Sequence, residues 1–265
     1  MALDRRVGVI GGTGQLGGAI VRGWLSSGVV APENLWISNR SGINTAFPEW
    51  GGITFCTDNQ QLADTCDVIL LSVPPAQFGA VDIDAGDSLV MSVMAGVTIE
   101  DMAGKTGAKR IIRCMSSPAA GLRLAYSVWC AGDGVTAEDR EAAQRLLSAC
   151  GVADEVPEER QIDLFTAMTG PVPGFVAMYA KCMTDYAVNR GIDPAVADRA
   201  IRQLFLASGT IFAHEKPTPA DHVKEMIDYA GTTAAGLLAM RNSPLYDSIE
   251  AGLDAAVEKA QSIAR

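Results

Sequence analysis

Short, nearly continuous runs of apolar residues recur through the first half of the chain. Val7–Ile10 is the first, and Asp67–Val73 and Ser88–Val93 contain few polar positions that could face water. Such runs are typical of parallel strands buried on both faces. The pattern predicts further strands at 35–38, 53–55, 110–115, 127–130 and 153–156, with helices between them, among them 19–25, 60–64 and 137–149. This succession predicts a doubly wound α/β domain with a parallel sheet.

The pattern changes near residue 158, after which apolar residues recur with helical spacing and strand-like runs disappear. Helices are predicted at 163–189, 194–212, 219–226, 234–241 and 245–264. The first of these contains Thr169–Gly174 with two prolines, which remove amide donors and break or kink a helix. We therefore expect two domains, residues 1–157 around the sheet and residues 158–265 built of helices alone.

Composition narrows the classes of partner and cofactor. The chain has 265 residues, 48% of them hydrophobic, and a formal net charge of −10, which argues against a general nucleic-acid binder. No run is apolar enough to span a bilayer, and Met1–Arg6 leads directly into the first strand without room for a signal peptide. The six cysteines form no C-x-x-C pair, and the histidines are only His214 and His222. We therefore expect reduced thiols in a cytoplasm, no metal and no membrane partner.

A glycine turn joins the first strand to the first helix. Gly12, Gly14 and Gly17 fit G-x-G-x-x-G, the turn that binds a dinucleotide. Gly12 is expected to allow the tight turn. Gly14 would let the backbone approach a pyrophosphate, and Gly17 would let the helix pack closely on the strand. The first helical amides then point at the phosphates. The residues predicted to contact the dinucleotide are Gly12, Thr13, Gly14, Gln15 and Leu16. The alternative is that the glycines form a turn with a structural role only.

The end of the second strand indicates which dinucleotide is bound. An NAD site usually has an acidic residue there for the ribose 2′-hydroxyl, whereas this chain has Asn39, Arg40 and Ser41. A guanidinium with two small hydrogen-bonding side chains suits a 2′-phosphate. We predict NADP as the cofactor; the alternative is that Arg40 is a solvated loop cation.

Two later strands end in loops at the carboxyl edge of the sheet, where ligands bind in such folds. One loop contains Val73, Pro74 and Pro75, and the other contains Ala95 and Gly96, whose small size would let a nicotinamide ring lie close to the backbone. These residues and Asn59, next to a predicted helix cap, complete the predicted cofactor site.

Four local patterns, in order, resemble the pyrroline-5-carboxylate reductase family. The glycine turn is the first, and Ser92–Val97 resembles the family's S-I-A-A-G-V. Thr166–Phe175 resembles T-A-L-S-G-S-G-P-A-Y, and Ala230–Leu237 resembles the signature G-G-T-T-I-A-G-L. The resemblance covers nearly the whole chain. It implies an N-terminal Rossmann domain that binds NADP and a C-terminal all-helical dimerisation domain, hence a homodimer or a higher homo-oligomer.

The resemblance also implies a substrate and a substrate loop. The family reduces a cyclic imine, and the hydroxyl corresponding to Thr233 orients it. The alternative is that Thr232 and Thr233 only cap a helix starting at Ala234. The implied substrate-binding residues are Asp228, Tyr229, Ala230, Gly231, Thr232 and Thr233.

Departures from the family pattern leave the substrate open. The family's V-K-P-Q is Val73–Ala76 here, and its R-x-M-P-N-T-P-A is Arg113–Ala119, one residue shorter. Asp228-Tyr229 replaces the Ser-Pro of the loop that holds the substrate carboxylate, so an unpaired Asp228 would repel a carboxylate. Arg113 or Arg241 could offset this. Asp228 is otherwise a solvated turn residue or a partner for a cationic substrate nitrogen.

The leading hypothesis is therefore an NADPH-dependent cyclic-imine reductase. The extra residue in Gly11–Gly14 also resembles the deazaflavin-dependent NADP reductases. Two alternatives are a divergent NADP reductase that acts on another imine or on deazaflavin, and a dinucleotide-binding regulator without turnover.

Overall fold

The computed structural model describes residues 3–263, and the packing of its Cα atoms divides the chain into two compact units. The first takes in the chain through Val172 and again from Ala255 onward, and the second is Pro173–Asp254. The division falls later than residue 157 because helix α5 (Arg160–Met168) packs on strands of the sheet. The ranges 1–157 and 158–265 stay a prediction of functional domains.

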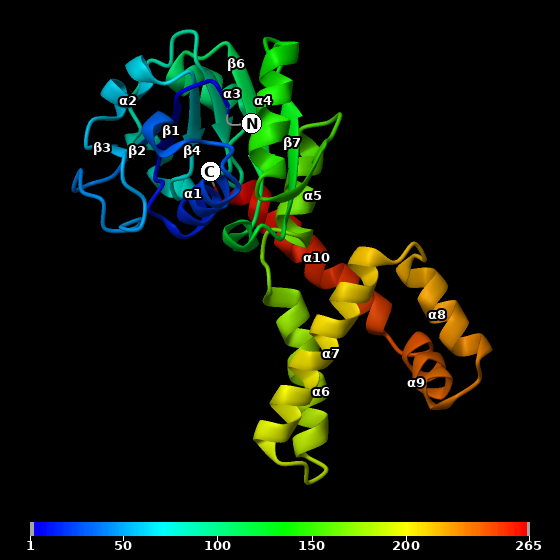
Figure 1. The fold of residues 1–265 in the computed structure, drawn as a ribbon. Helices are drawn as coiled ribbons and strands as arrows, with labels where there is room; N and C mark the ends of the chain where they lie inside the picture. Colours follow the sequence, from blue (N-terminus) through cyan, green and yellow to red (C-terminus); the bar gives the residue numbers. More distant parts are fainter. Residues whose placement is uncertain (1–2, 264–265) are drawn as a thin grey trace. The chain divides into compact units, whose positions relative to one another are not determined.

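The first unit is built on one eight-stranded sheet (Figure 1). The strand order is β3-β2-β1-β4-β5-β6-β7-β8, which runs outward from β1 in both directions. The strands are β1 (Val7–Ile10), β2 (Leu35–Ser38), β3 (Thr54–Cys56), β4 (Val68–Leu71), β5 (Leu89–Ser92), β6 (Arg110–Met115), β7 (Ala125–Ala131) and β8 (Gly151–Glu155). In the register, Ile10 lies beside Ser38 on one side and Leu71 on the other, so these three strands end together.

One pairing departs from the predicted parallel sheet, because β7 runs antiparallel to β6. Only residues 116–124, including the short 3-10 helix η3 (Pro118–Leu122), connect the two strands. A parallel crossover needs a dozen or more residues, so this short connection favours a reversal of direction. Strand β8 then pairs with β7 in parallel.

Helices cover both faces of the sheet, as a doubly wound fold requires (Figure 1). Helices α1 (Gln15–Ser27) and α4 (Ala137–Ser148) pack with Val9 and Leu70 in one core. Helices α2 (Asn59–Thr65) and α3 (Ile99–Thr106) pack with Ile69 and Leu71 on the other face, since side chains alternate along a strand. Helix α3 was not predicted. Two further 3-10 helices are η1 (Pro32–Asn34) and η2 (Pro75–Ala80).

The second unit is helical. It contains α6 (Gly174–Val188), α7 (Pro194–His214), α8 (Pro219–Asp228), α9 (Thr232–Arg241) and the first part of α10 (Leu245–Ser262). The predicted break at Thr169–Gly174 is confirmed, since α5 ends at Met168 and α6 begins at Gly174. Between residues 3 and 263, no helix combines the length and apolar character needed to cross a membrane.

Candidate cofactor and substrate sites

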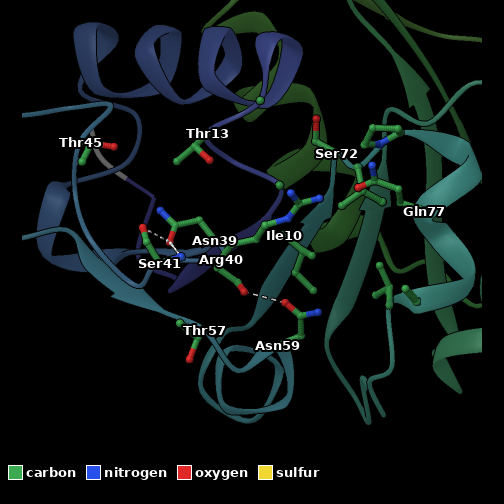
Figure 2. A pocket seen from close by; sticks show the side chains of 17 residues that line it. Ile10, Thr13, Asn39, Arg40, Ser41, Thr45, Thr57, Asn59, Ser72 and Gln77 are labelled. Atoms are coloured by element: carbon green, nitrogen blue, oxygen red, sulfur yellow. Dashed lines mark hydrogen bonds between the residues drawn. The ribbon is translucent and has the colours of Figure 1, made fainter.

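A cleft of about 850 Å³ lies where the strand order reverses, at the carboxyl ends of β1, β2 and β4 (Figure 2). Ligands of open α/β sheets bind at this switch point. Eight residues of the predicted cofactor set come together in this cleft: Thr13, Gly14, Asn39, Arg40, Ser41, Asn59, Val73 and Pro74.

The tight turn of the glycine loop is made by Gly11, which corrects the role predicted for Gly12. Gly11 has φ +87°, and a Cβ there would come within 2.5 Å of the Ser72 carbonyl oxygen. Gly12 is buried, and a Cβ there would meet the side chains of Val9 and Ile37 at 3.0–3.1 Å. At Gly17 a Cβ would lie 2.6 Å from the Gly11 oxygen, so this glycine permits close packing as predicted.

The start of α1 suits an anion. Gly14 is the N-cap residue, exposed and without a side-chain cap, and the first turn contains no acidic residue. The first amides of a helix have no acceptor within the helix and carry the positive end of its dipole. Gln15 is exposed beside this turn, whereas Leu16 is half-buried against the core. Contacts of Gly12 and Leu16 with a cofactor remain predictions.

The loop after β2 forms the cationic end of the cleft. Asn39 Oδ1 accepts hydrogen bonds from the amides of Ser41 at 3.2 Å and Gly42 at 2.7 Å, which fixes the turn. The Arg40 side chain lies in the cleft (Figure 2). It has no hydrogen bond or ion pair with any residue that the structure describes. Because the cleft lining includes no acidic side chain, Arg40 is available to an anionic ligand.

Several polar residues of this cleft were not among the predicted contacts. Ser38 ends β2, and its hydroxyl donates to Asn59 Oδ1 at 2.6 Å (Figure 2). Ser72 follows β4 directly, so its position after an apolar strand was the available signal. Thr45, Thr57 and Gln77 lie in connecting segments without a comparable signal.

A second cavity, of about 900 Å³, contains Gly96, one of the two predicted nicotinamide contacts. Its lining includes Pro75 and Gly96 together with Phe78, Val97 and Arg113. Pro74 and Gln77 line the first cleft instead. The segment from the end of β4 through η2 therefore contributes different residues to the two cavities. Ala95 packs against an apolar cluster that includes Met115 of β6 and Ile162 of α5.

The predicted substrate loop lies in the helical unit, between α8 and α9. Gly231 is the N-cap of α9 without a side-chain cap, and Thr232 and Thr233 are its first two residues. The capping interpretation of these threonines is therefore wrong. Their side chains are exposed, and neither makes a hydrogen bond to another residue in the described chain. Ala230 has φ +57°, a conformation that costs an alanine roughly 1–2 kcal/mol.

Asp228 is not an unpaired charge in this loop. It is the last residue of α8, and its Oδ2 lies 2.5 Å from Lys224 Nζ, one helical turn earlier. The hydrogen bond and the charge of Asp228 raise the pKa of Lys224, which stays protonated. Arg113, which could offset Asp228 according to the sequence, is buried in the first unit and paired with two carboxylates.

Five of the six cysteines are buried, and Cys182 is exposed. Burial raises the pKa of Cys66, Cys114 and Cys150 to about 12, so these thiols stay protonated and unreactive. All six cysteines are free. Over residues 3–263, no cluster of three or more His, Cys, Asp or Glu could hold a metal ion.

Comparison with known proteins now places this geometry in a family. Residues 159–263 match the pyrroline-5-carboxylate reductase dimerisation family, and residues 6–96 match the coenzyme F420-dependent NADP oxidoreductase family. Pyrroline-5-carboxylate reductase 2 of Bacillus subtilis is 31% identical over 253 residues, which cover 92% of this chain and 90% of that one. The chain belongs to the pyrroline-5-carboxylate reductase family.

Solved structures agree with this assignment at the level of the fold. A pyrroline-5-carboxylate reductase from Coxiella burnetii has a TM-score of 0.89 at 23% identity, covering 99% of this chain and 100% of that one. The Plasmodium falciparum pyrroline carboxylate reductase, solved with NADP bound, has a TM-score of 0.82 at 21% identity and covers both chains fully. The predicted fold class is confirmed: an N-terminal α/β domain followed by a helical dimerisation domain of the pyrroline-5-carboxylate reductase family.

Proposed function

We propose that this protein is an NADPH-dependent reductase of a cyclic imine. Bound NADPH supplies a hydride from nicotinamide C4 to the imine carbon, and the imine nitrogen receives a proton. The C=N double bond becomes a C–N single bond, as in the conversion of a pyrroline to a proline-type product, and NADPH is oxidised to NADP⁺. The observation that carries the proposal is the 31% identity with a pyrroline-5-carboxylate reductase over nearly the full length of both chains.

The first cleft fits the adenosine and pyrophosphate parts of NADPH. Gly14 leaves room at the start of α1, where uncapped amides can bind the pyrophosphate. Arg40, with Ser41 beside it, is the unpaired cation suited to the 2′-phosphate. The predicted contacts at Pro74, Pro75, Ala95 and Gly96 are assigned to the nicotinamide end.

The start of α9 fits the substrate. The Thr233 hydroxyl is exposed and does not cap the helix, so it is available to orient the imine nitrogen. The uncapped first amides of α9 suit a substrate carboxylate. A cyclic imine is already activated when its nitrogen is protonated, so orientation by a hydroxyl, with proximity to the nicotinamide, is the main contribution required of this chain.

The helical unit supports a homodimer or a higher homo-oligomer. The single chain leaves Met178 and Leu206 63% and 64% exposed, and Ile211 is 43% exposed. Among the described residues α6 has no buried side chain, and α7 has only Ala197. Apolar helices of this kind need a partner surface, and a second copy is the partner consistent with the dimerisation-family match.

The free thiols of the protein are consistent with a cytoplasmic location.

A second candidate substrate is a deazaflavin. The match of residues 6–96 to coenzyme F420-dependent NADP oxidoreductases favours it. That match ends at Gly96 and does not include the helical region, so it bears on the cofactor half of the site more than on the substrate half.

Steady-state kinetics would separate the candidates. NADPH oxidation is measured with pyrroline-5-carboxylate, with unsubstituted pyrroline and with oxidised coenzyme F420, under identical conditions. The proposal predicts turnover of at least one cyclic imine with kcat/KM well above that for F420. Turnover of F420 alone would favour the second candidate, and NADPH binding without turnover of any substrate would favour a dinucleotide-binding regulator.

A further inference from the structure

An ion cluster around the buried Arg113 joins the sheet to the start of α5 and to the start of α3. Arg113 is 2% exposed on β6, between Ser92 of β5 and Cys130 of β7 in the register. Its two terminal nitrogens bind two carboxylates: Nη1 lies 3.2 Å from Oε1 of Glu159, the N-cap residue of α5, and Nη2 lies 2.5 Å from Oδ1 of Asp163 in α5. The two acids are four residues apart, so they lie on the same face of the helix.

The same carboxylate oxygen of Glu159 also holds a backbone amide. Glu159 Oε1 accepts a hydrogen bond from Ile99 N at 2.8 Å. Ile99 is the first residue of α3, directly after the loop that follows β5. That loop contains Ala95 and Gly96, the predicted contacts of the nicotinamide, and Gly96 has φ +73°. Glu159 therefore fixes the far end of this loop.

Apolar packing holds the other end of the loop. Ala95 packs against the cluster that contains Ile162 of α5 and Met115 of β6. Glu159, the N-cap residue of α5, thus holds the loop at Ile99, and the apolar cluster that includes Ile162 of α5 packs against Ala95. The buried Arg113 keeps Glu159 and Asp163, and with them α5, in place, because a buried guanidinium left without either carboxylate is strongly disfavoured.

We propose that Glu159, anchored by Arg113, is a positioning residue that sets the 95–98 loop for the nicotinamide half of NADPH. It touches neither the cofactor nor the substrate in this account. The inference rests on the proposed function, because the loop contacts the nicotinamide only if the protein binds NADPH as proposed. The contacts of Glu159 with Arg113 and Ile99 are present without any cofactor. It assigns a role in hydride transfer to α5, which lies far along the chain from the glycine turn.

The test compares Glu159→Ala with Glu159→Gln and with Glu158→Ala. Glutamine keeps an oxygen that can accept from Ile99 N, whereas alanine does not. Glu158 is the neighbouring exposed carboxylate, paired with Arg160, and serves as the matched control.

Amide hydrogen exchange of peptides spanning residues 95–99 and 11–17 is measured without cofactor. Binding of NADPH and of 2′,5′-ADP, which lacks the nicotinamide half, is measured by titration, and kcat is measured with the best imine substrate.

Glu159→Ala is expected to accelerate exchange in 95–99 but not in 11–17. It should leave 2′,5′-ADP affinity within about twofold and lower kcat by roughly tenfold or more, since small misplacements of reacting groups are costly. Glu159→Gln should restore part of the loss, and Glu158→Ala should match wild type. Unchanged exchange in 95–99 and unchanged kcat in Glu159→Ala would overturn the inference alone, whereas a wild type that binds neither NADPH nor 2′,5′-ADP would overturn the proposed function as well.

Discussion

Lys224 and Asp228 form an ion pair across one turn of α8, with 2.5 Å between Lys224 Nζ and Asp228 Oδ2. The pair lies at the turn that leads to Gly231 and the predicted substrate hydroxyl of Thr233. The expectation that Asp228 repels a substrate carboxylate assumed an unpaired aspartate. With Lys224 beside it, the turn presents a balanced pair of charges.

Lys224→Ala should therefore expose the repulsion that the sequence suggested. We expect the KM for pyrroline-5-carboxylate to rise by about tenfold, while the KM for unsubstituted pyrroline, which has no carboxylate, stays nearly constant. The double variant Lys224→Ala, Asp228→Ser should recover most of the loss. Steady-state kinetics on both substrates provides the measurement, and equal changes for the two substrates would show that Asp228 does not face the ligand.

Arg40 should determine the preference for NADPH over NADH. A charge-assisted contact with the 2′-phosphate is worth about 1.5–3 kcal/mol, so wild type should bind NADPH roughly tenfold or more tightly than NADH. Arg40→Ala should remove most of that difference and leave NADH affinity nearly unchanged. Dissociation constants from cofactor fluorescence would decide this, and equal affinities of the wild type for the two cofactors would contradict the assignment.

The apolar surface of the helical unit should be covered by a second copy of the chain. Leu206→Glu puts a charge on the exposed face of α7 and should shift the protein toward monomers at micromolar concentration. Val152→Glu changes a residue of similar exposure on β8 and should leave the assembly intact. Light scattering coupled to size exclusion measures both, and a stable wild-type monomer would refute the dimer.

Asp139 should make stability fall in acid. It is fully buried and accepts hydrogen bonds from Arg5 at 3.1 Å and Arg110 at 2.8 Å. Burial alone raises its pKa, but hydrogen bonds from Thr136, Arg5 and Arg110 outweigh this and lower the pKa below its usual value. A carboxyl with a depressed pKa stabilises the folded state above its unfolded pKa, and this contribution is lost as the pH falls through the folded value.

Asp139→Asn should therefore cost about 3 kcal/mol of unfolding free energy at pH 7 and flatten the loss of stability below about pH 4. Glu141→Gln, an exposed position on the same helix, is the control. Denaturant unfolding across pH gives both quantities. A variant as stable as wild type at pH 7 would mean that the ion cluster is dispensable.

The strand ends were predictable because apolar runs such as Val68–Leu71 are bounded by polar or small residues, and the cleft follows from where parallel strands end. The choice between Gly11 and Gly12 was not, because the contact that decides it is with Ser72, some sixty residues later. The pairings of Lys224 with Asp228 and Arg113 with Glu159 depend on side-chain direction and on packing of distant elements. The predicted helix 219–226 stopped short of Asp228, so the first pair was not predicted, and no local pattern marked the second.

Transfer of deuterium from NADPH to a cyclic imine would demonstrate the proposed reductase activity. The protein is supplied with NADPH deuterated at C4 on the transferred face and with pyrroline-5-carboxylate or unsubstituted pyrroline, and the product is analysed by mass spectrometry and NMR. We expect a saturated cyclic amine with one deuterium on the former imine carbon, formed in step with NADP⁺. NADPH oxidation without deuterium at that carbon, or no reaction with any cyclic imine by a protein that binds NADPH, would contradict it.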